Sequence, residues 1–107
     1  MGFNDIKQRV ISCLLEGTYD HEVRRNIDVK NLFQCGQLSE QFLMELILAT
    51  RGSQYDVSPH HKAPEIDVHV MKPVKNRLEW YIKFYFVDPD LMFISVHQSE
   101  QKKWRLV

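Results

Sequence analysis

The sequence predicts an α+β domain in which two N-terminal helices pack on one face of a three-stranded antiparallel sheet. Apolar residues recur at helical spacing in the first half of the chain, and they alternate with polar residues in three segments of the second half. Turn-forming residues separate these segments. The 107 residues fit a single domain, 1–107, with a helical half over 4–52, a sheet half over 65–99 and a short basic tail over 100–107.

The first predicted helix covers residues 5–16. Its apolar positions follow the i, i+4, i+7, i+8 spacing of one helix face, and they are Ile6, Val10, Cys13 and Leu14. Either Asn4 or Asp5 can cap its beginning, and Gly17 can end it in the left-handed conformation that glycine tolerates. This face is expected to point toward the sheet.

The second predicted helix begins after Ser39, a residue type that caps helix N-termini well. A broad apolar stripe follows, formed by Phe42, Leu43, Met44, Leu46 and Ile47. The helix is expected to stop at Arg51-Gly52. Between the two helices, Asp28 can cap a short helical turn that ends at Gly36.

Three strands are predicted because apolar and polar residues alternate with a period of two over 65–71, 78–87 and 91–98. Residues 52–63 hold Gly, Ser, Pro and a pair of histidines, so they are expected to form a loop. Turns are expected around Pro73 and around Pro89.

The register between the last two strands decides which side chains share a face, because a slip of one residue reverses all of them. A three-residue loop over 88–90 pairs Phe84 with Ile94 and gathers the main apolar positions on one face. A two-residue loop over 89–90 would pair Phe84 with Ser95 and divide that apolar set. We therefore expect the three-residue loop.

In this register the opposite face carries polar groups that could do chemistry, with Tyr81 opposite His97, Lys83 opposite Ser95 and Tyr85 opposite Phe93. Asp67 and His69 join this face if the first strand lies antiparallel beside the second with the same inward set. Metal-free cleavage of RNA needs a general base, a general acid and a cation near the phosphate, which these side chains could supply. Tyrosine rings can also stack on unpaired bases. Equally, Tyr and Lys are common on solvent-facing sheets for cross-strand packing alone.

Net charge, cysteine spacing and the length of apolar runs argue against a basic nucleic-acid binder, a zinc or redox site and a membrane span. Lys and Arg together number 14 and Asp and Glu number 14, so the net charge of zero gives no argument for nucleic-acid binding. Cys13 and Cys35 lack the C-x-x-C spacing of a zinc or redox site, and the adjacent His60 and His61 would point apart along an extended chain. We expect no metal and no cofactor. Without a signal-peptide pattern or an apolar run of about 18 residues, a cytoplasmic protein with no membrane span is expected.

Three strand segments, IDVHVMKP, WYIKFYF and FISVHQ, resemble strands of the MqsR-like messenger-RNA interferases, which are toxins of bacterial toxin–antitoxin pairs with a RelE/BrnT-like fold. On that match Tyr81 and Lys83 fall on the family's tyrosine and lysine, and His97 falls where the family has a functional lysine. His69 stands where the family has a tyrosine. The segment ATRGSQYD lacks the family's lysine and leaves Arg51 and Tyr55 as substitutes.

The resemblance implies a ribosome-independent endoribonuclease that a cognate antitoxin holds inactive. We therefore expect cleavage of single-stranded RNA, with His97 or His69 as general acid or base and Tyr81 as an auxiliary acid or orienting hydroxyl. Lys83 or Arg51 would stabilise the phosphate. The residues expected to bind the substrate are Arg51, Tyr55 and Tyr85.

The alternative is a non-enzymatic protein-binding module, such as an immunity, antitoxin or inhibitor protein. It would use the same tyrosine-rich face, because aromatic residues are enriched at protein interfaces. The neutral net charge suits this alternative better than it suits a nuclease.

Overall fold

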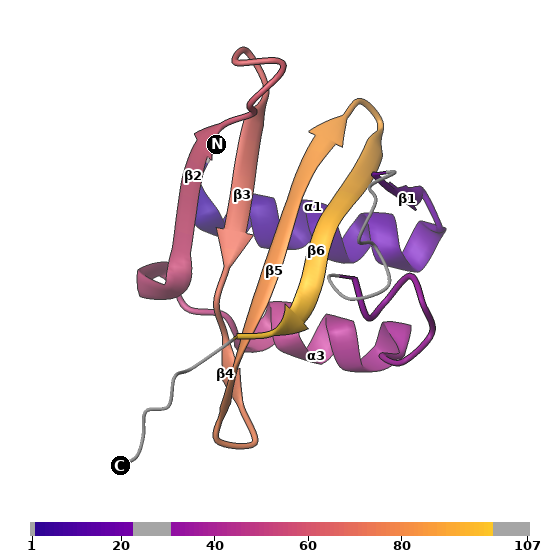
Figure 1. The fold of residues 1–107 in the computed structure, drawn as a ribbon, viewed down its shortest axis with the longest axis vertical. Coiled ribbons are helices and arrows are strands. Elements are labelled where there is room, and N and C mark those ends of the chain that lie inside the picture. Colours follow the sequence, from indigo (N-terminus) through magenta and orange to yellow (C-terminus); the bar gives the residue numbers. More distant parts are fainter. Residues whose placement is uncertain (1, 23–30, 100–107) are drawn as a thin grey trace.

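A computed structural model describes residues 2–22 and 31–99, and it confirms the α+β class. The helices are α1 (Phe3–Glu16), α3 (Glu40–Ala49) and the short 3₁₀ helix η1 (Gly52–Gln54). The strands are β1 (Tyr19–His21), β2 (Tyr55–Pro59), β3 (Asp67–Met71), β4 (Val74–Lys75), β5 (Leu78–Val87) and β6 (Asp90–Gln98). Both α-helices lie on one side of the sheet, behind the strands in Figure 1.

The sheet is larger than the sequence predicted. Over residues 2–22 and 31–99 it has six strands in the order β1-β6-β5-β3-β2, with β4 paired to β5, and β1 runs parallel to β6. The prediction of a three-stranded antiparallel sheet was therefore wrong, although its three strands are present as β3, β5 and β6. Of the additional strands, β1 and β4 have only three and two residues, which is too short for a strong alternation signal, whereas the five residues of β2 were expected to belong to a loop.

Both predicted helices are present, and their apolar faces form the core. In α1 the buried side chains are those predicted, Ile6, Val10, Cys13 and Leu14, and Gly17 ends the helix with a φ of 76°. The α3 helix begins where predicted, because the Ser39 hydroxyl accepts a hydrogen bond of 3.1 Å from the Phe42 N–H. These helices cover the side chains of Met71, Ile82, Phe84, Leu91, Phe93 and Val96. No helix in the described ranges is long and apolar enough to cross a membrane.

The segments between these elements follow the prediction less closely. Part of the predicted short helical turn, with Asp28, and the basic tail over 100–107 lie outside the described residues. Gly36 has a φ of 82°, in keeping with a turn that stops there. Residues 52–63 were expected to be a loop, but they contain η1 and the edge strand β2, which pairs antiparallel with β3.

The β5–β6 register combines a shorter turn with a bulge. Val87 pairs with Asp90, so the turn has two residues rather than the three that were predicted, and Phe84 pairs with Phe93 rather than Ile94. A bulge between Lys83 and Phe84 then shifts the register by one residue. Beyond the bulge the predicted pairs are present. The extra residue of the bulge replaces the extra residue of the predicted loop.

The strand β3 presents the opposite faces to those expected. Its pairing places His69 beside Phe84 and Met71 beside Ile82, on the face that the helices cover. Val68 instead lies on the other face, where it forms a small buried cluster with Tyr85 and Ile94. Both sheet faces are thus partly apolar, so alternation alone could not decide which face of β3 meets the helices.

Candidate functional site

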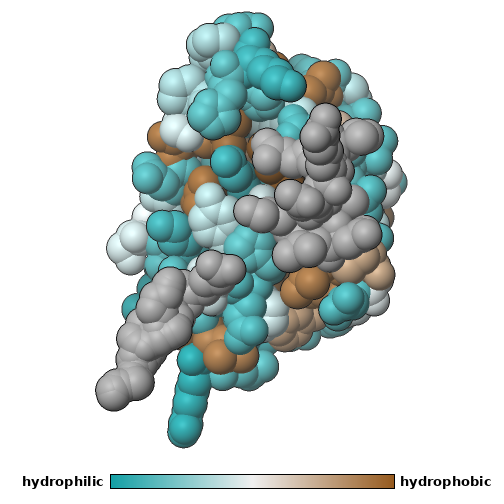
Figure 2. All heavy atoms as spheres, in the orientation of Figure 1, coloured by the Kyte–Doolittle hydropathy of each residue, from teal (hydrophilic) through white to brown (hydrophobic). Residues whose placement is uncertain are grey.

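The sheet face opposite α1 and α3, called the outer face below, holds the largest group of predicted site residues. The side chains of β5 and β6 on this face are Tyr81, Lys83, Tyr85, Ser95 and His97. They lie there because side chains point alternately to the two faces of a strand, and the core residues of these strands take the other face. Figure 2 shows this side of the molecule, where hydrophilic surface is interrupted by apolar patches. The predicted pairs Tyr81 with His97 and Lys83 with Ser95 are both confirmed.

His97 is half-buried, with one ring nitrogen engaged and the other without a partner. Its ring stacks on Tyr81, with centroids 5.2 Å apart and an interplanar angle of 24°. Its Nδ1 lies 2.9 Å from the carbonyl oxygen of Gln98. Because a carbonyl only accepts hydrogen bonds, Nδ1 must carry a proton. In the neutral ring Nε2 then has a free lone pair, and no atom of residues 2–22 or 31–99 occupies it.

Tyr81 and Lys83 add two unengaged polar groups to the free Nε2 of His97. Both are half-buried, and neither the Tyr81 hydroxyl nor the Lys83 ammonium has a hydrogen-bond or ion-pair partner in the described part of the chain. They stand two residues apart on the same face of β5, with His97 across the strand pair from Tyr81. A base, a hydroxyl and a cation therefore share one surface.

Tyr85, which was predicted to bind substrate, is tied into the structure instead. It is only 8% exposed, and its hydroxyl donates a hydrogen bond of 2.9 Å to Oε2 of Glu22. The same oxygen lies 3.2 Å from Nε2 of His60, whose Nδ1 accepts the backbone N–H of Lys62. The tautomer of His60 is thereby fixed with its proton on Nε2. Both nitrogens are engaged, so His60 holds the β2–β3 loop against the segment after β1.

His69 lies on the opposite side of the sheet from His97, as the reversed faces of β3 require. It is 6% exposed, and its ring lies between those of Tyr55 and Phe84, with centroid distances of 5.9 and 5.3 Å. Its Nδ1 is 2.7 Å from the Tyr55 hydroxyl. Burial lowers the pKa of His69, while the nearby Asp67 carboxylate opposes that shift. The expectation that both imidazoles share one face was therefore wrong.

Arg51 and Tyr55 do not join the outer face either. Tyr55 packs against Phe3 of α1, with ring centroids 5.0 Å apart, so it lies on the helix side. Burial is the largest cause that raises the pKa of Tyr55, followed by the Asp67 carboxylate. Arg51 is exposed at the beginning of η1, where its backbone N–H donates to the Gln54 side chain.

Sequence reasoning missed two contacts that depend on β2. The link between Glu22 and His60 joins positions 38 residues apart, and no local pattern indicates it. The contact between Tyr55 and His69 could have been found, because Tyr55 and Val57 alternate with polar residues up to Pro59. That alternation is the signal of a short edge strand.

Comparison with known proteins adds no relative. No family description matches the chain, and neither a curated protein nor a solved structure matches it.

Proposed function

We propose that the protein is an endoribonuclease that cleaves single-stranded RNA on the outer face without a metal ion. The observation that carries the proposal is that Nε2 of His97, the Tyr81 hydroxyl and the Lys83 ammonium face one surface without protein partners in the described ranges. Side-chain polar groups bond mostly to backbone or to water, so three such groups without a protein partner are open to a ligand. A base, a hydroxyl and an ammonium left unengaged together are what a phosphodiester substrate would use.

In the proposed reaction, Nε2 of His97 removes the proton of a ribose 2′-hydroxyl. The 2′-oxygen forms a bond to phosphorus, and the bond between phosphorus and the 5′-oxygen breaks. The Lys83 ammonium stabilises the charge that develops on the phosphorane oxygens. The Tyr81 hydroxyl donates a proton to the departing 5′-oxygen and regains it from His97 through water. The products are a 2′,3′-cyclic phosphate and a 5′-hydroxyl.

The assignment is narrower than the one expected from the sequence. His69 is removed from the outer-face reaction because it is buried on the other side of the sheet. The ring of Tyr85 is largely buried, so it is not assigned to base stacking. Lys83 rather than Arg51 supplies the cation, since only Lys83 shares the face with His97.

The test is incubation of the purified protein with single-stranded RNA in excess EDTA, with the ends of the products identified. We expect 2′,3′-cyclic phosphate and 5′-hydroxyl ends. The His97→Gln variant should lose at least about 100-fold in rate, the typical contribution of a general acid or base. His61→Gln changes an exposed loop histidine and is the matched control, which should keep the wild-type rate. Absence of cleavage by the wild-type protein would refute the proposal and favour the protein-binding alternative.

We further propose that a cognate antitoxin covers the outer face and blocks the reaction. Expression of the wild-type chain alone in bacteria should arrest growth, and expression of His97→Gln should not. Growth that is unaffected by an abundant wild-type protein would contradict the toxin proposal.

A further inference from the structure

Besides tyrosine, four polar residues are buried in the described part of the chain, namely Asn31, Thr50, His69 and Ser95. The first three each make a side-chain hydrogen bond, with lengths of 2.9, 2.8 and 2.7 Å. The Ser95 hydroxyl has no hydrogen-bond partner within residues 2–22 and 31–99. Of these four side chains, Ser95 is the one whose polar group the fold does not use.

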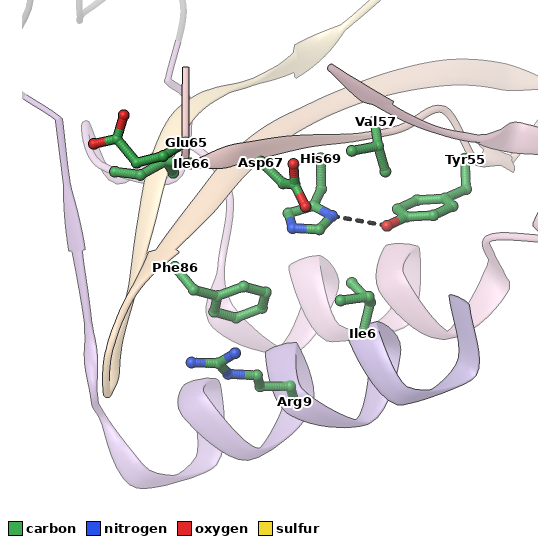
Figure 3. A pocket seen from close by; sticks show the side chains of 9 residues that line it. All are labelled: Ile6, Arg9, Tyr55, Val57, Glu65, Ile66, Asp67, His69 and Phe86. Atoms are coloured by element: carbon green, nitrogen blue, oxygen red, sulfur yellow. Dashed lines mark hydrogen bonds between the residues drawn. The ribbon is translucent and has the colours of Figure 1, made fainter. Parts of the chain in front are cut away.

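His69 is accounted for by its neighbours, although it lies beside a cavity of about 440 Å³ on the helix side (Figure 3). The Tyr55 hydroxyl donates to Nδ1, since its own proton would otherwise be unsatisfied, so neutral His69 carries its proton on Nε2. The imidazole is in edge contact with the Phe86 ring, with centroids 5.5 Å apart and an interplanar angle of 64°. The Arg9 guanidinium lies 4.0 Å from the centre of that same ring. These rings fill the space next to His69.

The burial of the Ser95 hydroxyl has no structural return. The residue is only 6% exposed, so the hydroxyl has given up most of its contact with water. A buried hydroxyl that makes no hydrogen bond destabilises the folded chain, and alanine at this position would keep the packing without that cost. Groups of this kind are found where a ligand, an ion or a water molecule supplies the missing bond, or where the group serves in catalysis.

The β-bulge of β6 brings Ser95 to the outer face. The register shifts between Lys83 and Phe84, which leaves Ile94 as the extra residue of β6. Ile94 belongs to the outer-face cluster, and Val96 belongs to the core beneath the helices. Ser95 pairs with Lys83 and therefore shares the outer face with Ile94. Bulges are frequent next to active sites, where they redirect a side chain, and without this one Ser95 would face the helices.

Ser95 stands among the three groups of the proposed reaction. Lys83 is its direct cross-strand partner, and the Cβ atoms of such a pair lie about 4.5–5.5 Å apart. His97 is two residues further along the same face of β6, a distance of about 7 Å. Tyr81 is the diagonal neighbour across the strand pair. Serine has the shortest of these four side chains, so its hydroxyl lies closest to the sheet, at the centre of the group.

The charges around Ser95 favour an anion. The Lys83 ammonium has no ion-pair partner in the described ranges, and a hydroxyl can donate to an anionic oxygen. The Glu22 carboxylate also reaches the outer face, but it already accepts hydrogen bonds there, one of them from Tyr85. Asp56 lies in the same row across the sheet, two strand spacings or roughly 10 Å from Lys83. A tetrahedral oxyanion presents several acceptor oxygens, so it can meet the hydroxyl and the ammonium together.

We propose that Ser95 is a further substrate-binding residue, whose hydroxyl donates a hydrogen bond to a non-bridging phosphate oxygen beside the Lys83 ammonium. The inference rests on the proposed function for the identity of this phosphate as the scissile group of RNA. In that reaction the non-bridging oxygens gain negative charge as the 2′-oxygen bonds to phosphorus, so the hydrogen bond becomes stronger toward the transition state. Ser95 itself gains and loses no proton.

The first experiment measures binding of inorganic phosphate to the ¹⁵N-labelled protein, at a pH of about 8, where a phosphate group is mostly dianionic. Sodium chloride of the same ionic strength is the reference. Phosphate should shift the backbone amide signals of Ser95 and Lys83. Ser95→Ala should weaken binding at least about tenfold, the usual contribution of a hydrogen bond to a charged group. Ser58→Ala, on the exposed strand β2, is the matched control and should bind as the wild type does.

Two results of this titration would overturn the proposal. One is that chloride produces the same shifts as phosphate, which would indicate screening of charge without a binding site. The other is equal phosphate affinity in Ser95→Ala and Ser58→Ala.

Thermal denaturation separates a binding role from a structural one. Because the Ser95 hydroxyl makes no hydrogen bond in the described structure, Ser95→Ala should unfold at the same temperature as the wild type or at a higher one. Loss of phosphate binding together with unchanged or increased stability is typical of a residue kept for function. A clear decrease in the unfolding temperature would assign the hydroxyl to the fold and overturn the proposal.

RNA cleavage in EDTA distinguishes failure of this inference from failure of the proposed function. Ser95→Ala should lower kcat about 100-fold, the typical loss for one donor to a developing charge, and Ser58→Ala should not change it. Full activity of Ser95→Ala would overturn this inference and leave the cleavage proposal standing. Phosphate binding that depends on Ser95, in a wild-type protein that cleaves no RNA, would support the phosphate site and refute the cleavage proposal.

Discussion

The two histidines on either side of β5 lie in opposite environments, although both of their strands pair with β5 in one sheet. His97 on β6 is half-buried on the outer face and stacks on a single ring. His69 on β3 is buried on the helix side and contacts the rings of Tyr55, Phe84 and Phe86. The face on which each strand places its histidine therefore decides which imidazole can meet a polymer and which is buried beneath the helices.

The largest expected effect comes from two adjacent residues of β5 that point to opposite faces. Phe84 is fully buried beneath the helices, so Phe84→Ala should lower the free energy of unfolding by about 3–5 kcal/mol. Lys83→Ala, on the outer face, should change it by less than about 0.5 kcal/mol. Urea denaturation measures both values. Similar losses in the two variants would mean that the two faces do not differ as described.

Lys83→Met tests the chemistry of the outer face, because it removes the ammonium and keeps most of the side chain. We expect kcat for RNA cleavage to fall about 100-fold with little change in KM, since the ammonium acts on charge that develops only in the transition state. Lys72→Met changes an exposed lysine just beyond β3 and is the control. A loss confined to KM would assign Lys83 to substrate binding alone.

The Glu22 carboxylate should matter for stability and not for cleavage. Oε2 of Glu22 accepts hydrogen bonds from Tyr85 and His60, so Glu22→Ala should lower the free energy of unfolding by about 1–3 kcal/mol. Glu16→Ala, at the exposed end of α1, should have little effect. Thermal denaturation compares the two. Retained stability with lost cleavage would instead place Glu22 in the reaction.

The smallest expected effect is a pH dependence of stability on the helix side. Burial lowers the pKa values of His69 and His21 in the folded chain, so the unfolded chain binds more protons. Their contribution is fully present above the unfolded value of about 6.5 and is lost as the pH falls through the lower folded values. Denaturation curves between about pH 7 and pH 5 should show decreasing stability. The slope should be smaller in His69→Phe and unchanged in His61→Gln.

The sequence predicts the helices and the strands β3, β5 and β6, because each has a strong periodic pattern. Ser39 is a local cap that no tertiary contact needs to support, and Gly17 supplies a left-handed end. The edge strands depend on pairing with distant segments. The β1 strand, for example, forms through its parallel contact with β6, about 70 residues away along the chain.

The candidate site was predictable only in part, because its geometry also depends on how distant segments pair. The pairing of Tyr81 with His97 was predicted from a three-residue loop, yet it arises from a two-residue turn and a bulge. Without the bulge, the register near the turn would carry His97 to the face of Trp80. The place of His69 could not be predicted, since Val68 and Met71 are both buried and lie on opposite faces.

The most direct test of the contrast between the two histidines is a long-range ¹H–¹⁵N spectrum of the imidazoles, recorded over a pH series. Neutral His97 should carry its proton on Nδ1, which leaves Nε2 free as a base. Neutral His69 should carry its proton on Nε2 and should stay neutral to a pH below about 6.5. A His97 ring protonated on Nε2 in its neutral form, or a His69 ring that charges above that pH, would contradict the account.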